Sequence, residues 1–409
     1  MRAAILCLAA ALGAGAWLAA CTAPDPAPEP PPAAAMTTLR VATYNVSLYG
    51  EEAGAVLVRL AGGRDRQARR VAAVLQHLRP DLLLLNEVDY DEGGRLADLL
   101  QREYLEVGQF GEAPIHYPYR FLAPVNTGVP SGMDLNRDGR IGGHGREHGD
   151  DAFGYGLYPG QYGMLVLSRF PIAMDEVRTF QRLPWAALPG ARRPIDPMGG
   201  GWWYDDAVWP RLRLSSKSHW DVPVDTPLGR LHFLVSHPTP PVFDGEENRN
   251  GLRNADELTL WRHYLDGGEA PWLCDDQGRC GGLPPGARFV IAGDLNNDPA
   301  DGNGLREAIV ELLEHPRVLR LRTPESRGAV AAARRYPELP RRGNPAHATG
   351  DFGPGSGTLR LDYVLPSTGF DVRASGVFWP LPGETGADWI EASDHHPVWV
   401  DLAGPEALP

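Results

Sequence analysis

The sequence predicts an α/β domain that spans residues 39–404. Short apolar runs typical of strands recur between residues 39 and 402, and stretches with helical periodicity lie between several of them. No linker-like segment and no internal repeat interrupts the chain after residue 40. Strands and helices that follow one another without such a break favour a single domain in which both pack around shared cores.

The first elements follow from residue spacing. Residues 39–46 alternate as in a strand, with Asn45 on the same face as the apolar positions. Residues 67–79 carry apolar side chains at i, i+3, i+4 and i+7, the stripe of an amphipathic helix, and the helix must end before the following proline. The wholly apolar run 82–85 predicts a short strand that is buried.

The remaining elements repeat these two patterns. Further strands are predicted at 163–168, 231–237, 289–294, 359–365 and 398–402. Helices are predicted at 254–265 and 304–313. The sequence therefore predicts a mixed α/β architecture.

Residues 1–20 are typical of an export signal. Arg2 is followed by an apolar, Ala-rich run that ends in Leu-Ala-Ala-Cys21, which resembles a bacterial lipobox. The resemblance implies cleavage before Cys21, lipidation of its thiol and attachment to the cell envelope outside the cytoplasm. An uncleaved membrane anchor is the alternative. Residues 21–38, rich in Pro and Ala, are expected to form an extended tether.

The charge balance argues against one class of partner. The formal net charge is -13 and the pI is near 5.4, so no broad basic surface is expected to hold nucleic acid by counterion release. A local basic patch stays compatible with these values.

Two cysteines remain beyond the signal and Cys21. Cys274 and Cys280 flank a short acidic loop. In an exported protein two nearby thiols predict a local disulfide. A redox or metal pair is the alternative, but no further cysteine is present to complete a tetrahedral site.

Polar side chains stand at or just beyond the ends of apolar strands, where ligand sites gather in α/β proteins. A single Asp after a strand is usually a turn or cap residue, but this set is larger: Asn45, Glu87, His237, Asp294, Asn296 and Asp394.

Seven segments occur in the order found in a known superfamily. They are ATYNV, PDLLLLNEV, GQYGMLVLSRFPI, LVSHPTPP, AGDLNNDP, RLDYVL and SDHHPV, spread over residues 39–402. The chain thus resembles the endonuclease/exonuclease/phosphatase superfamily. The resemblance implies a four-layer α/β sandwich, in which two mostly antiparallel sheets pack face to face between helices. Asn86 departs from this pattern, since many relatives carry Gln there, and we expect it to support the site rather than to bind metal.

The resemblance also implies a role for each site residue. Asn45, Glu87 and Asp394 would hold Mg²⁺, with Mn²⁺ as the alternative ion, because hard cations prefer oxygen ligands. Asp294 would activate the attacking water, and Asn296 would present its amide to the same phosphate. His395 would bind a phosphate oxygen while Asp362 orients it. His237 would stabilise the transition state or protonate the leaving alkoxide.

Two weaker patterns leave alternatives open. Residues 134–140 fit the first half of a structural Ca²⁺ loop, although Gly145 replaces the final Glu; a solvated acidic turn is the alternative. The proposed ligands are Asp134, Asn136, Asp138 and Arg140, the last through its carbonyl. Lys217 and His219 are candidates for substrate contact, or else belong to a charged strand edge.

Three functions follow from the sequence. The first is a Mg²⁺-dependent phosphodiesterase or nuclease, and the second is a phosphomonoesterase or sphingomyelinase-like phospholipase with the same chemistry. The third is a catalytically silent binding lipoprotein, which would bind Mg²⁺ weakly and turn over no phosphoester. We expect a monomer with a phosphoester substrate, a membrane contact through the lipid anchor and no protein partner.

Overall fold

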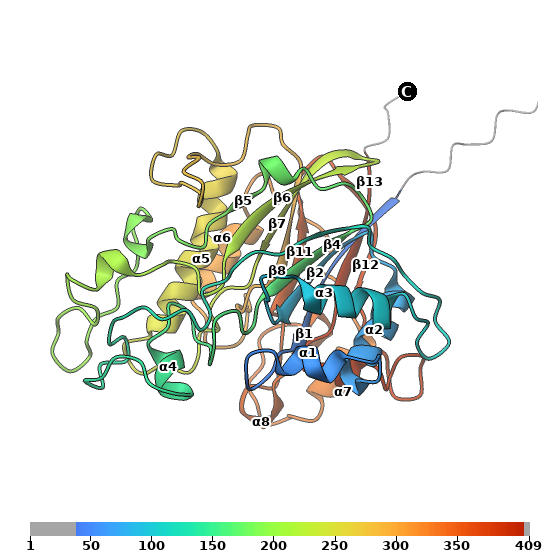
Figure 1. The fold of residues 1–409 in the computed structure, drawn as a ribbon. Helices are drawn as coiled ribbons and strands as arrows, with labels where there is room; N and C mark the ends of the chain where they lie inside the picture. The colour runs from blue at the N-terminus through green and yellow to red at the C-terminus, as the bar shows by residue number, and fades with distance from the viewer. Residues whose placement is uncertain (1–37, 405–409) are drawn as a thin grey trace, which may run out of the picture. The chain divides into compact units, whose positions relative to one another are not determined.

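A computed structural model describes residues 38–404, which form two β-sheets packed face to face between helices (Figure 1). The predicted signal, the predicted lipidation site Cys21 and all of the predicted tether except Thr38 lie outside the described residues. Within residues 38–404, no helix combines the length and the apolar content that crossing a bilayer requires.

The first sheet has six strands in the order β12-β13-β1-β2-β4-β3. Only β1 and β2 run parallel, and all other neighbours are antiparallel. The strands are β1 (Thr38–Leu48), β2 (Leu82–Val88), β3 (Tyr119–Phe121), β4 (Met164–Ser168), β12 (Asp371–Val377) and β13 (Val398–Ala403).

The second sheet has five strands in the order β11-β8-β7-β6-β5, with β7 and β8 as its parallel pair. Its strands are β5 (Arg178–Thr179), β6 (His219–Thr226), β7 (Gly229–Ser236), β8 (Phe289–Asp294) and β11 (Asp362–Pro366). A separate two-stranded ribbon pairs β9 (Gly350–Asp351) with β10 (Thr358–Leu359).

Helices cover the outer faces of both sheets (Figure 1). Asp65 begins α2, because its side chain accepts a hydrogen bond from the backbone N–H of Ala68 at 2.8 Å. The α-helices are α1 (Ala55–Leu60), α2 (Arg66–Leu78), α3 (Arg95–Leu99), α4 (Arg146–Asp150), α5 (Arg249–Asp266), α6 (Arg306–Leu313), α7 (Arg327–Ala333) and α8 (Gly353–Ser356). A π-helical turn, η1 (Leu100–Leu105), continues α3, and 3₁₀ turns lie at η2 (Met174–Glu176), η3 (Trp185–Ala187), η4 (Trp209–Arg211), η5 (Pro345–His347) and η6 (Ile390–Ala392).

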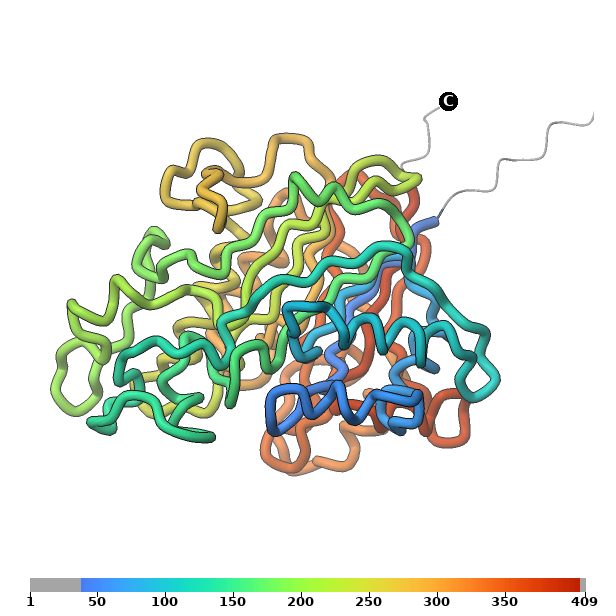
Figure 2. The backbone as a smooth tube through the Cα atoms, in the orientation of Figure 1, coloured from blue at the N-terminus to red at the C-terminus, as the bar shows by residue number. Residues whose placement is uncertain are grey.

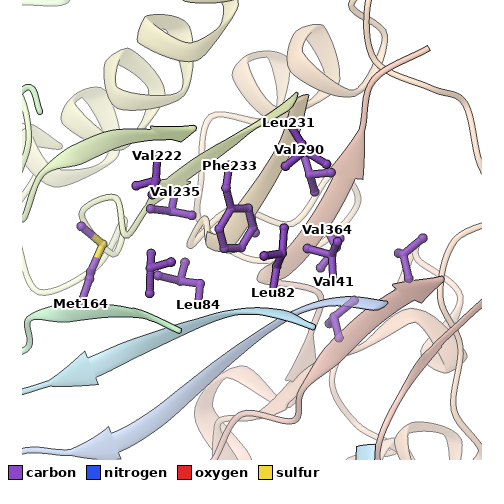
Figure 3. Packing of buried hydrophobic residues seen from close by; sticks show 14 of the residues in the cluster. Val41, Leu82, Leu84, Met164, Val222, Leu231, Phe233, Val235, Val290 and Val364 are labelled. Carbon is purple, nitrogen blue, oxygen red and sulfur yellow. The ribbon is translucent and has the colours of Figure 1, made fainter. Parts of the chain in front are cut away.

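Three apolar cores separate four layers, as the family resemblance implied. The middle core lies between the sheets, where Leu84 of β2 faces Phe233 of β7 (Figure 3). The alternate residues of β2, such as Leu83, pack against α2 on the outer side. A third core joins β8 to α5 and α6. The wholly apolar run in β2 thus reflects burial on both faces, and each such leucine contributes roughly 2 kcal/mol of burial.

The structure differs from the expected elements in two places. The predicted strand 359–365 is split into β10 and β11, because the N–H of Arg360 donates to the carboxylate of Asp298 at 2.7 Å instead of pairing in the sheet. The strand β6 was not predicted, although every residue in it except Asp225 is buried. It contains a proline and two aspartates, which weaken the strand pattern.

Two long irregular segments lie together at one end of the second sheet (Figure 2). The carboxylate of Asp196 accepts a hydrogen bond from Arg137 at 2.8 Å, and the indole of Trp203 donates to the carbonyl of Leu135 at 3.2 Å. These contacts join residues 122–163 to residues 180–218.

The disulfide between Cys274 and Cys280 is present, as the sequence predicted. It closes a loop whose Asp275 and Asp276 bind arginines and backbone groups nearby, including those of Arg178 and Arg182.

Candidate active site

The predicted catalytic residues lie together where strands of the two sheets end. Asp362 begins β11 and pairs in register with Asp294, which ends β8. The side chains come from six strands or their immediate flanks: Asn45 from β1, Glu87 from β2, His237 after β7, Asp294 from β8, Asp362 from β11 and His395 before β13. Residues far apart in sequence therefore meet because the sheet topology places their strand ends together.

Asp294 lies at the centre of this site. Its Oδ2 is 3.1 Å from Nδ2 of Asn45, 3.4 Å from Nε2 of His237 and 3.5 Å from Nε2 of His395. Burial opposes ionisation, but the charge of His395 and the hydrogen bond from His237 hold the pKa of Asp294 below its usual value. The carboxylate is therefore ionised at neutral pH.

His395 and Asp362 form a buried charged pair. Nδ1 of His395 is 2.8 Å from Oδ2 of Asp362, which also accepts a hydrogen bond from the hydroxyl of Thr349 at 2.7 Å. Burial alone would lower the pKa of His395, but Asp362 and Asp294 raise it well above its ordinary value. Burial raises the pKa of Asp362 to about 6, and His395 opposes that rise. At neutral pH the pair is an imidazolium and a carboxylate.

His237 has the opposite charge state. Burial, together with the positive charges of Lys217 and His395, lowers its pKa to about 4 against the effect of Asp294. Its Nδ1 is enclosed and has no hydrogen-bond partner among the described residues. His237 is thus a neutral imidazole at pH 7.

Glu87 and Asn45 form the side of the site that could hold a metal. Nδ2 of Asn45 donates to Oε1 of Glu87 at 3.1 Å, and the Glu87 side chain is 20% exposed. Burial raises the pKa of Glu87 despite the bond from Asn45 and the charge of His395. A cation beside this carboxylate would offset that cost.

Asp394, the third predicted metal ligand, is exposed. Its Oδ1 is 3.4 Å from the hydroxyl of Ser47 and 3.4 Å from that of Ser393. The backbone N–H of Ser47 donates to Oδ1 of Asn45 at 3.2 Å, and the hydroxyl of Ser393 donates to the carbonyl of Asn45 at 2.8 Å. Asp394 is therefore connected to Asn45 through Ser47 and Ser393.

Two asparagines brace the loops that carry the acids. Oδ1 of Asn86 accepts from the N–H of Asp294 at 3.1 Å, so this residue links the two sheets behind the site, as expected. The Nδ2 of Asn296 donates to the carbonyl of Pro238 at 3.1 Å, and its N–H donates to Oδ1 of Asp294 at 3.0 Å. Asn296 thus joins the segments after β7 and β8 in this state.

The two candidate substrate-binding residues have different surroundings in the structure. Lys217 is buried close enough for Glu87 and Asp294 to raise its pKa, although burial lowers that pKa overall. His219 lies in the interior instead, with its ring nitrogens bonded to the hydroxyl of Ser215 and the carbonyl of Glu257. Because both nitrogens are occupied and burial lowers its pKa to about 3, His219 does not face a ligand, and the sequence hypothesis for it is wrong.

The acidic loop at residues 134–140 is held by its own backbone. Oδ1 and Oδ2 of Asp134 accept from the N–H groups of Asp138 and Gly139, and Asn136 and Asp138 also accept backbone N–H groups. In the described residues the one group of three candidate metal-binding side chains is Asp294, Asp362 and His395, so none lies in this loop. Calcium at Asp134, Asn136, Asp138 and the Arg140 carbonyl stays a prediction.

Two supporting residues escaped sequence analysis. Thr349 bonds Asp362 but sits in a loop with no motif of its own. Glu257 lies on α5, where its carboxylate accepts the N–H groups of Ser216 and Thr239 at 2.8 and 2.6 Å. The sequence shows only that Glu257 lies next to apolar positions of an amphipathic helix. That pattern does not indicate which groups the carboxylate binds.

The geometry supports a defined chemistry. An ionised carboxylate lies within reach of one charged and one neutral imidazole, and oxygen ligands for a cation lie beside them. Such a site can accept a proton from water and stabilise negative charge on an oxyanion.

Comparisons with known proteins agree with this geometry. The model of the Endonuclease/Exonuclease/phosphatase family matches residues 42–395. The crystal structure of an endonuclease/exonuclease/phosphatase from Beutenbergia cavernae DSM 12333 is similar over 90% of this chain and 72% of its own, with a TM-score of 0.50 and 20% identity. This likeness shows a shared fold.

Two other solved structures are similar at lower scores. Sphingomyelinase C from Streptomyces griseocarneus is 18% identical, with a TM-score of 0.42 over 89% of this chain and 99% of its own. The human Nocturnin catalytic domain with bound sulfate anion is 15% identical, with a TM-score of 0.43 over 90% of this chain and 93% of its own. No curated protein matches the chain.

Proposed function

The chain belongs to the endonuclease/exonuclease/phosphatase family, whose members are hydrolases of phosphoester bonds, and we propose that it is a Mg²⁺-dependent phosphodiesterase. It is a hydrolase acting on ester bonds, like the rest of the family. The observation that carries the proposal is the position of Asp294, whose Oδ2 lies within 3.5 Å of both His237 and His395.

Asp294 takes the proton of the attacking water. Its low pKa makes it a weak base while His395 and His237 both stabilise its charge. A bound phosphoryl group would draw these imidazoles towards its own oxygens, which raises the pKa of Asp294 and strengthens it as a base. The water oxygen then bonds to phosphorus in line with the leaving oxygen, the bond between phosphorus and that oxygen breaks, and the departing alkoxide takes a proton from solvent.

The two histidines have separate tasks. His395, charged and fixed by Asp362, donates from Nε2 to a phosphoryl oxygen as negative charge develops. His237 orients Asp294 and can donate its one ring proton towards the oxygens of the reacting group. Asn296 and Asn86 hold the backbone on which Asp294 sits.

Glu87, Asp394 and Asn45 would hold Mg²⁺. The donor set fits a hard cation, because it offers carboxylate and amide oxygens and leaves room for water ligands. Asn45 points Nδ2 at Glu87, so binding through its oxygen requires its amide to turn over. When bound, the ion would neutralise charge on the phosphoryl and leaving oxygens. Mn²⁺ is the alternative ion.

The charges of the site favour a diester substrate. Glu87, Asp294, Asp362 and Asp394 place four carboxylates within one small region. A phosphodiester carries one negative charge and a phosphomonoester carries two at neutral pH, so the diester meets less repulsion. The overall charge of -13 favours small diesters over long nucleic acids.

Hydrolysis of four esters tests the proposal. Bis-p-nitrophenyl phosphate, p-nitrophenyl phosphate, plasmid DNA and sphingomyelin are each offered with Mg²⁺, Mn²⁺, Ca²⁺ or chelator. We expect the diester to be hydrolysed with Mg²⁺ and chelator to abolish turnover. Preference for the monoester or for sphingomyelin would replace the diesterase proposal, and inactivity on all four esters with every metal would leave the silent binding protein.

The same proposal includes a location. The apolar run before Cys21 supports export and lipid attachment to the bacterial cell envelope, with the domain outside the cytoplasm. The predicted disulfide, present between Cys274 and Cys280, is compatible with an oxidising compartment.

A further inference from the structure

Lys217 is the only lysine in the sequence. All other members of the 39 Lys and Arg residues are arginine. Lys217 is also 6% exposed, whereas lysine is almost never fully buried unless it is paired. A chain that otherwise uses arginine for positive charge thus places one compact ammonium in its interior.

The backbone at Ser216 and Lys217 is held by Glu257 and Asn126. The fully buried carboxylate of Glu257 accepts the N–H of Ser216 at 2.8 Å and the N–H of Thr239 at 2.6 Å. The N–H of Asn126 donates to the carbonyl of Lys217 at 3.0 Å. These bonds tie the segment before β6 to the segment after β7, so Lys217 and His237 are presented by one braced framework.

The ammonium has no structural partner. Within residues 38–404 it makes no hydrogen bond or ion pair, yet the carboxylates of Glu87, Glu257 and Asp294 act on it and raise its pKa against the effect of burial. Its Nζ is not fully enclosed, unlike Nδ1 of His237. A buried charge without a partner is costly, and an incoming anion would relieve that cost.

The positive charges of the site are arranged unevenly. His395 is charged beside Asp362, whereas His237 is neutral. A phosphoryl group that reaches Asp294 therefore meets a charged imidazole at His395 and a neutral imidazole at His237. Lys217 lies on the side of His237, because the hydroxyl of the preceding Ser216 donates to the carbonyl of His237 at 3.5 Å and the charge of Lys217 acts on that imidazole.

We infer that Lys217 is a further catalytic residue, whose ammonium binds a non-bridging oxygen of the substrate's phosphoryl group beside Glu87, His237 and Asp294. The inference rests on the proposed phosphodiesterase function. An ammonium offers three donors around one charge and can follow the oxygen as phosphorus changes geometry. The planar guanidinium of arginine presents its donors in a fixed fork instead.

Kinetics of two matched charge removals test the role. Lys217→Met should lower kcat/KM for bis-p-nitrophenyl phosphate on the order of 100-fold, the effect of losing one donor to a developing oxyanion. Arg211→Met removes an exposed cation from the same segment and should change kcat/KM less than about twofold. Lys217→Arg should recover only part of the lost activity. Wild-type kcat/KM in Lys217→Met, with the variant folded, would overturn the inference.

A binding measurement separates this role from a structural one. Biosynthetic labelling with lysine carrying ¹³C at Cε gives one lysine resonance in the full chain, and Lys217→Arg confirms its assignment by removing it. Inorganic phosphate with Mg²⁺ should shift this resonance saturably at fixed pH, while sodium chloride at equal ionic strength should not. A resonance that ignores phosphate would overturn the inference.

The two measurements also distinguish this inference from the function on which it rests. If the wild type hydrolyses no ester but phosphate still shifts the Lys217 resonance, the phosphodiesterase proposal fails and the phosphate contact stands. If the wild type is active while Lys217→Met matches it and phosphate causes no shift, the phosphodiesterase proposal stands and the role of Lys217 fails.

Discussion

The positive charge of His395 lies between two carboxylates, those of Asp362 and Asp294. We expect His395→Ala to lower kcat on the order of 10³-fold, because the donor to the phosphoryl oxygen is lost. Asp362 then has no cation beside it and takes up a proton near neutral pH, so the variant should remain folded. As a control, His116→Ala breaks an exposed pair with Glu106 and should keep its kcat.

The same substitution has a defined pH dependence. The folded-state pKa of His395 is above the unfolded value near 6.5. Its contribution to stability is therefore complete below about pH 6.5 and is lost as the pH rises through the folded-state pKa. The free energy of unfolding measured in urea should differ most between the wild type and His395→Ala below pH 6.5. A difference that grows in alkaline solution would contradict this assignment of charge.

His219 should behave in the opposite way. It is buried as a neutral ring with a pKa of about 3, so the unfolded chain binds its proton first as the pH falls below about 6.5. Wild-type protein should lose about 2 kcal/mol more stability than His219→Gln between pH 7 and pH 5, which is the linkage expected for one proton. Equal losses in urea unfolding would show that His219 is charged in the fold.

At the scale of elements, the close approach of β7 and β8 fixes the position of Asp294. A Cβ at Gly293 would lie 2.1 Å from the backbone carbonyl oxygen of Ser236, closer than any real contact. We expect Gly293→Ala to lower the free energy of unfolding by about 3 kcal/mol and to reduce turnover, because β8 must move away from β7.

Gly201→Ala provides the matched control, since a Cβ there meets no atom within 4 Å. Thermal unfolding should leave this variant close to the wild type. A Gly293→Ala protein with unchanged stability and turnover would show that the two strands can separate without moving the carboxylate.

Elements also show where sequence analysis succeeds and where it stops. The run Leu82–Leu85 and the helix of α2 could be predicted because their periodicity records burial directly. Strand β6 could not, since Asp221 in it is buried by bonds to His232 and to Tyr264, which lie elsewhere in the chain. Such a compensated polar residue is invisible until the fold is known.

The candidate site likewise contains residues that could be predicted from the sequence and residues that could not. The strand-end positions of Asp294 and His237 and the seven ordered segments allowed most of the site to be predicted. Thr349 and Glu257 could not be found, because their roles depend on backbone groups brought to them by the fold. His219 was misassigned because its two ring-nitrogen partners, the hydroxyl of Ser215 and the carbonyl of Glu257, cannot be identified before the fold is known.

At the scale of the whole molecule, the proposed anchor is separable from catalysis. Cys21→Ser should move the protein from the membrane fraction to the soluble fraction, because the thiol that would carry the lipid is removed. The kcat of the released protein should equal that of the wild type, since Cys21 lies outside the catalytic domain. Fractionation followed by an activity assay checks both statements. A variant that stays with the membrane would favour the uncleaved apolar anchor.

The pairing of β1 with β13 determines where a fusion partner or a solid support can be attached to the domain. Thr38 pairs with Ala403, so both ends of the described chain leave from one point (Figure 1). Asn45 lies seven residues along β1, about 23 Å away at the rise of a strand, and His395 lies just before β13 begins. A fluorescent protein fused at either end, or a bead to which either end is coupled, would therefore stand well clear of Asp294, and the catalytic edge would face the surrounding solution.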